Sequence, residues 1–252
     1  MRRENIIIDD KKQRCYYLIN KNGEERRVTR LGTSELSSCI DDDLECGDEL
    51  CVGGGFAGGE EYLVVDDCLE AWKMLSVVLS RNNPQTIEEK CECVQEVVDN
   101  FFGDFSHANE REKFYCGSGV KLSSFAHQNI AACTERAVLS HMMLLSISVK
   151  STLRMTEFIN NEGKLDHHAY NLIDDEDNCF LYDSTQPTLN GNVISPIIAR
   201  IPKDVYDGMK KSNISGGIGV HVVHYNPIMG KNYDVIYNPG ENIYDVNEEK
   251  EK

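Results

Sequence analysis

Hydrophobic residues recur at the spacing of an α-helix in several segments of the chain. Residues 66–81 and 85–102 both place apolar side chains about three or four positions apart, as in helices with one buried face. Pro84, just before the second segment, suits the start of a helix. Residues 130–151 are apolar almost all round, so this segment predicts a helix that is buried on most of its sides.

Other segments have the pattern of β-strands. Residues 15–31 place Asn22-Gly23 between two runs of strand character, which is the usual signal for a short hairpin. Residues 167–173 and 179–183 predict a second hairpin, because the acidic turn 174–178 separates two short apolar runs. Further strands are predicted at residues 193–201, 218–225 and 233–237.

The order of these elements predicts the fold class and the domain limits. Residues 33–61 are rich in Ser, Asp and Gly and lack periodicity, so we expect an irregular connection and a boundary there. We divide the chain into an N-terminal hairpin and irregular region at 1–65, a core at 66–246 and a solvated acidic tail at 247–252. Helices first and an antiparallel sheet afterwards predict an α+β fold.

Composition and charge narrow the functions that fit this fold. The 252 residues are 40% hydrophobic, enough for a well-buried core. The 42 acidic residues outnumber the 26 Lys and Arg and give a net charge of −16, without a local basic patch. This charge repels nucleic acid and anionic membranes and favours a basic protein or peptide as partner.

The apolar segments are too short for export or for crossing a membrane. The N-terminal apolar run is Ile6-Ile7-Ile8, shorter than the apolar region of a signal peptide. The longest apolar stretch, residues 137–149, falls short of the roughly 20 residues of a spanning helix. The ten cysteines are scattered through the chain, which favours reduced thiols. We therefore expect a cytoplasmic protein.

Two patterns resemble cofactor sites but lack their context. Residues 53–58 contain a G-x-G-x-x-G pattern, but the acidic pair Glu60-Glu61 follows where a phosphate-binding loop requires a helix start. The cysteines at 39, 46 and 51 lack the paired short spacings of zinc sites. We expect neither a cofactor nor a metal ion.

Three positions supply the parts of a nucleophilic site. Cys133 lies in or near the first turn of the predicted buried helix, where backbone N–H groups and the helix dipole favour a thiolate, and Arg136 adds a positive charge. His168 and Asp183 fall on the two arms of the second hairpin. Pairing across the turn brings Asp183 to one imidazole nitrogen and leaves the other for Cys133. His167 is the competing base, because adjacent strand residues face opposite ways.

These residues lie within three blocks that resemble the core of transglutaminase-like proteins, which have a papain-like fold. The blocks are Cys133-Thr134-Glu135-Arg136-Ala137, His168-Ala169-Tyr170-Asn171-Leu172 and Tyr182-Asp183-Ser184-Thr185. The resemblance covers about residues 85 to 190. It implies a nucleophilic cysteine on a buried helix packed against an antiparallel sheet, and it selects His168 over His167. Two positions depart from the family pattern: Ala132 replaces a frequent Gly and Tyr170 a frequent Trp.

The resemblance implies acyl transfer or hydrolysis at an amide through a thioester. Cys133 is then the nucleophile, His168 the base and acid, and Asp183 the group that orients His168. The oxyanion requires donors: the backbone N–H of Cys133 is one, and Gln128, Asn129 or His127 offers a second, with Gln128 our choice. Asn129 also fits the simpler role of helix cap.

Three other functions remain open from the sequence. One is a non-catalytic module that binds a protein partner on the same scaffold, and another is a cysteine peptidase. The third is a secreted bacterial effector, for which the Glu-rich tail gives weak support. We expect a basic polypeptide as substrate, cleaved or modified at a side-chain or isopeptide amide.

Overall fold

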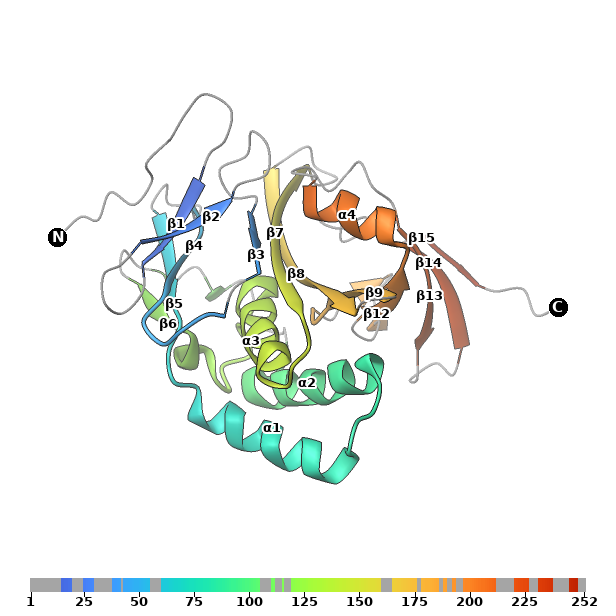
Figure 1. Ribbon diagram of the computed structural model, residues 1–252, viewed down its shortest axis with the longest axis horizontal. Helices are drawn as coiled ribbons and strands as arrows, with labels where there is room; N and C mark the ends of the chain where they lie inside the picture. Colours follow the sequence, from blue (N-terminus) through green and yellow to red (C-terminus); the bar gives the residue numbers. More distant parts are fainter. Residues whose placement is uncertain are drawn as a thin grey trace.

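A five-stranded antiparallel sheet, with strand order β12-β9-β8-β7-β3, forms the centre of the structure (Figure 1). Its strands are β3 (Ser38–Ile40), β7 (Ser151–Ile159), β8 (Leu165–Asp175), β9 (Asn178–Asp183) and β12 (Ile197–Ile201). The computed structural model describes residues 15–19, 25–29, 38–41, 43–54, 60–104, 110–111, 115, 119–159, 165–175, 178–185, 188–189, 192–193, 197–211, 220–226, 231–237 and 245–248.

The helices α3, α2 and α1 form successive layers on this sheet, with α3 next to its strands. Helix α3 (Cys133–Ser146) lies beside β7 and β8, α2 (Ile87–Phe102) packs against α3, and α1 (Leu69–Asn82) packs against α2 (Figure 1). Helix α2 begins with a capping box, because Thr86 Oγ1 accepts from the Glu89 N–H at 3.1 Å and Glu89 Oε2 accepts from the Thr86 N–H at 3.0 Å. A fourth helix, α4 (Lys203–Lys211), follows β12 and contacts β9.

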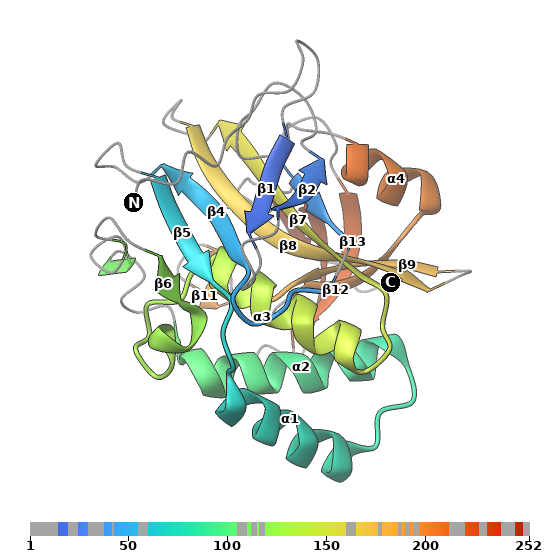
Figure 2. The ribbon, with the colours of Figure 1, turned by 60° about the vertical axis from the view of Figure 1, so that its left-hand side comes forward.

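A second five-stranded sheet, with order β2-β1-β4-β5-β6, lies on the N-terminal side of the molecule (Figure 2). Its strands are β1 (Cys15–Ile19), β2 (Glu25–Thr29), β4 (Glu49–Gly54), β5 (Glu60–Val64) and β6 (Val120–Lys121), which leads into the 3₁₀ helix η2 (Leu122–Phe125). The remaining strands are β10 (Thr188–Leu189), β11 (Asn192–Val193), β13 (Val220–Asn226), β14 (Lys231–Tyr237) and β15 (Asp245–Glu248).

One hydrophobic core joins the N-terminal strands to the helices. Ile40, the last residue of β3, and Leu63 of β5 belong to the same buried cluster as Val97 of α2 and Leu139 of α3. The side chains of Leu63, Val97 and Leu139 are completely buried. The core therefore continues across residue 65, where we expected the catalytic region to begin.

The α+β class, the first three helices and both hairpins are confirmed. The turn of the first hairpin, at 20–24, and the last residues of the acidic tail, at 249–252, lie outside the described residues. Within the described part of the chain, no helix is both long enough and apolar enough to cross a membrane.

Several predicted boundaries were wrong. The segment 33–61 contains β3, β4 and the start of β5, because short strands there pair with strands distant in the sequence. The buried helix ends at Ser146, and the apolar residues that follow continue into β7 rather than extending the helix. Helix α4 was not predicted, and β15 includes the first residues of the expected tail.

Candidate active site

Cys133 is the first residue of α3, and the segment before it is attached to the end of α2. The His127 N–H donates to the Phe101 carbonyl at 2.8 Å, and the Asn129 N–H donates to the Phe102 carbonyl at 3.1 Å. These bonds fix the approach of the chain to the helix. Cys133 is partly exposed.

Gly103 allows the close contact between these two segments. Its φ of 80° lies in the left-handed region, and a Cβ at this position would come within 1.8 Å of Asn129 Oδ1. Asn129 Oδ1 in turn accepts from the Asp104 N–H at 3.1 Å. Asn129 therefore binds the chain just beyond α2, and the N-cap of α3 is Ala132, so the simpler role of helix cap predicted for Asn129 was wrong.

His168 and Asp183 meet across the β8–β9 hairpin. The β8–β9 ladder ends with Asn171 opposite Tyr182, so Asp183 follows the last position of β9 that pairs with β8. His168 Nε2 and Asp183 Oδ2 are 2.7 Å apart, and both residues are buried. The pairing leaves Nδ1 as the imidazole nitrogen that is available to Cys133.

The electrostatics of His168 favour its protonated form. Burial by itself lowers the pKa of His168, but the charge and the hydrogen bond of Asp183, together with a hydrogen bond to Cys133, raise it well above 6.5. The same interactions show that the Cys133 thiol and the imidazole are in contact. The structure thus brings together Cys133, His168 and Asp183, the three residues predicted as a triad.

Asp183 is fixed by further hydrogen bonds around it. Its second oxygen, Oδ1, accepts from the Thr185 N–H at 3.0 Å. Gln95 of α2 accepts from the Tyr182 hydroxyl at 2.8 Å and donates to the Ser184 carbonyl at 3.2 Å. Both neighbours of Asp183 are thereby bound to α2, and this leaves the carboxylate little freedom to turn away from His168.

Tyr170 lies against the His168 ring. The two ring centroids are 5.9 Å apart at an interplanar angle of 28°, and Tyr170 is almost fully buried. An aromatic face in this position limits rotation of the imidazole and excludes water from it. Tyr170 thus supplies an aromatic ring beside the histidine.

The other predicted participants lie in different environments. Arg136 is fully buried and binds Asp99 at 2.7 Å and the Gly103 carbonyl, so it joins α3 to α2 and its charge is balanced there. His127 Nε2 is 3.1 Å from Glu70 of α1. Gln128 is exposed, and its backbone N–H donates to the Phe125 carbonyl at 3.3 Å.

The Cys133 backbone N–H remains the better-defined oxyanion donor. It belongs to the first turn of α3, whose N–H groups have no acceptor within the helix. His167 is described only by its backbone, on β8 opposite Glu157 of β7.

A charged cluster beside Cys133 was not found from the sequence. Glu135 is fully buried, and its carboxylate accepts from Arg111 Nε at 2.9 and 3.0 Å, from the Tyr115 hydroxyl at 2.5 Å and from the Ala132 N–H at 2.9 Å. Burial alone would raise the pKa of Glu135, but Arg111 and these hydrogen bonds lower it. The one signal of this cluster in the sequence was the position of Glu135, three residues after Ala132, where the glutamate of a capping box stands at a helix start.

Three other cysteines are less suited to nucleophilic chemistry. Burial raises the pKa of Cys39 to about 11 and also raises the pKa values of Cys68 and Cys91. Among the cysteines whose side chains the structure describes, Cys133 included, none forms a disulfide. No group of metal-ligating side chains is found among the residues that the structure describes.

No model of a known protein family matches the chain, and no curated protein or solved structure gave a match.

Proposed function

We propose that the protein is a cysteine-dependent enzyme of transglutaminase-like, papain-related fold that transfers or hydrolyses an acyl group at an amide. The observation that supports this proposal is the buried His168, held by Asp183 at 2.7 Å and in contact with Cys133 at the start of α3. A charged acceptor on one side of the imidazole and a thiol on the other is the arrangement that a cysteine nucleophile requires.

The reaction proceeds through a thioester. The Cys133 thiolate attacks the amide carbonyl carbon, and the Cys133 N–H, with Gln128 as the proposed second donor, binds the oxyanion. The C–N bond then breaks, and His168 gives its proton to the departing nitrogen, which leaves as ammonia or an amine. Water or a second amine attacks the thioester, His168 accepts its proton, and the Cys133 thiolate is regenerated. Asp183 keeps His168 in the required orientation throughout.

The charge of the chain favours a basic protein or peptide as the substrate. A net charge of −16 attracts positively charged polypeptides and repels acidic ones at low salt. A side-chain carboxamide or an isopeptide bond is the proposed site of attack, in the cytoplasm or, for an exported effector, in a host protein.

The proposal is tested first by the reactivity of Cys133. The full chain is treated with limiting iodoacetamide at neutral pH, and the modified peptides are mapped by mass spectrometry. We expect Cys133 to react first, with the exposed Cys46 as an internal reference for an ordinary accessible thiol. A Cys46→Ser variant removes that competitor and is expected to leave the Cys133 rate unchanged. If Cys133 stays unmodified in the folded protein, the proposal fails.

The second test separates the chemical alternatives. Basic and acidic polypeptides that contain glutamine are incubated with the protein and with its Cys133→Ala variant, and ammonia release, amine incorporation and chain cleavage are followed together. Cys133-dependent ammonia release supports the proposal. Backbone fragments without ammonia would assign a cysteine peptidase, and no Cys133-dependent product would favour a binding module.

A further inference from the structure

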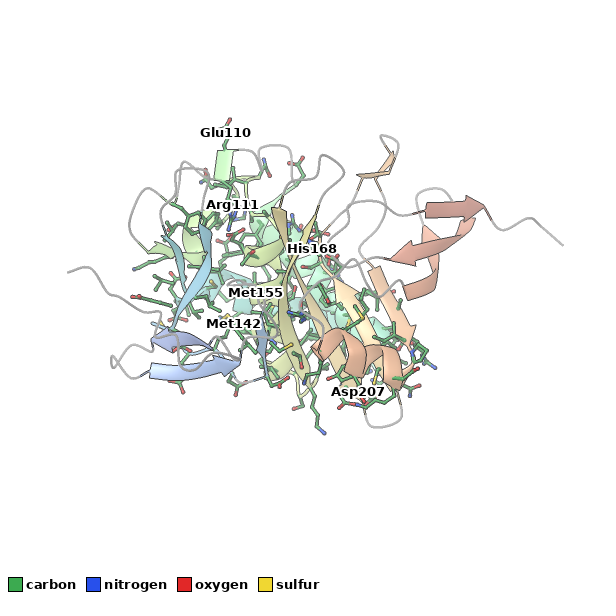
Figure 3. The ribbon with its side chains drawn as sticks, turned by 90° about the horizontal axis from the view of Figure 1, so that it is seen from above. Glu110, Arg111, Met142, Met155, His168 and Asp207 are labelled. Atoms are coloured by element: carbon green, nitrogen blue, oxygen red, sulfur yellow. The ribbon has the colours of Figure 1, made fainter. Side chains whose placement is uncertain are left out.

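A buried ion pair lies at the first turn of the helix that begins with Cys133. Arg111 binds the Glu135 carboxylate through Nε at 2.9 and 3.0 Å and through a second nitrogen at 2.8 Å. Its guanidinium also lies over the Tyr115 ring, 4.6 Å from the centroid. Figure 3 shows the Arg111 side chain pointing inward, whereas that of its neighbour Glu110 points out from the edge of the molecule.

Glu135 lies so close to Cys133 along the chain that neutralisation of its carboxylate by Arg111 affects the ionisation of the thiol. Glu135 is completely buried, two residues after the nucleophile, and it also accepts from the N–H of Ala132, directly before the nucleophile. A buried carboxylate this close disfavours a second negative charge, so without a counter-charge it would suppress the thiolate. Arg111 supplies the counter-charge.

Other charged groups around Cys133 are already paired. His168 of β8 is bound to Asp183 of β9, and Arg136 of α3 is bound to Asp99 of α2. Arg111 interacts with Glu135, Tyr115 and Cys133, and these interactions raise the pKa of Arg111 despite its burial.

We propose that Arg111 is a positioning residue that keeps Cys133 in its thiolate form by neutralising Glu135 at the start of α3. This inference rests on the proposed function, because it concerns the nucleophile of that reaction. Arg111 acts by neutralising the charge of Glu135 at the start of α3. The hydrogen bond from the Ala132 N–H to Glu135 holds that carboxylate next to the first residue of the helix. A purely structural brace would hold α3 in place without changing the proton affinity of the thiol.

The test is the pH dependence of Cys133 alkylation, measured by peptide mapping of the full chain. Arg111→Met leaves the Glu135 carboxylate without its counter-charge, so we expect the profile to move to higher pH and the rate at pH 7 to fall about ten-fold or more, the equivalent of one pKa unit. Glu135→Gln should move the profile to lower pH. The double variant should return toward the wild type, because both charges are gone.

The same variants can refute the proposed role of Arg111. If Arg111→Met is folded and its profile is unchanged, Arg111 does not act on the thiol. A double variant no faster than Arg111→Met would make Arg111 a structural brace, which also overturns the proposal. If Arg111→Met does not fold, Glu135→Gln decides alone: an unchanged profile, or one moved to higher pH, refutes the proposal.

The outcome is separable from that of the proposed function. A His168→Ala variant that keeps the wild-type profile would show that no thiolate–imidazolium pair forms, and the proposed function would fail. The shifts of the Arg111 and Glu135 variants would still report whether the cluster tunes the thiol.

Discussion

Replacing Asp183 by Asn tests the central contact of the site with little change in shape. The carboxylate accepts from His168 through Oδ2 at 2.7 Å and from the Thr185 N–H through Oδ1 at 3.0 Å. An Asn side chain can keep the bond to Thr185 through its carbonyl oxygen. Its NH₂ group then faces His168, where it donates rather than accepts.

The exchange of donor and acceptor changes the tautomer of His168. With an NH₂ group opposite Nε2, this nitrogen becomes the acceptor and the proton moves to Nδ1, which faces Cys133. A protonated Nδ1 in a neutral ring cannot accept the thiol proton. We expect turnover to fall by about 10²- to 10⁴-fold with the fold intact, as for orienting carboxylates in other triads.

The same substitution predicts a pH-dependent loss of stability. The folded pKa of His168 lies above its usual 6.5, so the stabilisation from the pair is fully present below the unfolded pKa and is lost as pH rises through the folded pKa. At pH 6 we expect Asp183→Asn to lower the free energy of unfolding by about 1.5–3 kcal/mol, the value of a hydrogen bond to a charged group. The difference from the wild type should shrink as the solution becomes alkaline.

Urea denaturation of both proteins over a range of pH measures this difference, and circular dichroism shows whether the variant is folded. Cys133 alkylation in the same samples reports the state of the nucleophile. A stability difference that does not change with pH would mean that His168 is not charged in the folded protein. An unchanged alkylation rate would show that Asp183 does not control the imidazole, and either result would refute the reasoning.

Further substitutions at five positions test separate parts of the site. Cys133→Ala should abolish turnover and His168→Ala should nearly do so, while His167→Ala stays active in the same assay; the reverse result for the two histidines would overturn our choice of base. Tyr170→Leu removes the ring stacked on His168 and should lower kcat about 2- to 10-fold, as expected for an aromatic pair, whereas Tyr170→Trp should retain activity. Gly103→Ala should lower the free energy of unfolding by about 1–3 kcal/mol, measured by urea denaturation, since φ is 80° and Asn129 Oδ1 occupies the Cβ position; an unaffected variant would contradict this packing.

The helices and the pairing of His168 with Asp183 could be predicted because their signals are local. Helix α2 has apolar periodicity and a capping box at Thr86 and Glu89, and both lie within one segment of sequence. The β8–β9 hairpin has a short acidic turn, so its pairing places His168 near Asp183 without reference to distant residues. The contact with Cys133 needed the family resemblance, because no local rule brings α3 to β8.

The parts that were missed depend on contacts between distant segments. Strand β3 is three residues long and gains its partner only from β7, more than a hundred positions later. Arg111 lies in a segment without periodicity, and only the fold brings it to Glu135. Arg136 was expected beside Cys133 because it is close in sequence, but the geometry of α3 directs its side chain to Asp99 instead.

The charges of the assembled site add a second argument for the proposed preference for basic substrates. In the proposed reactive form, the anionic groups are Cys133, Asp183 and Glu135, and the cationic groups that face them are His168 and Arg111. One negative charge remains in excess, in a site where His168 and Asp183 are largely screened from water. A positive group near the amide of the substrate would balance it, and a negative group would oppose formation of the thiolate. Under the proposed function, binding and activation of the nucleophile would thus favour the same class of polypeptide.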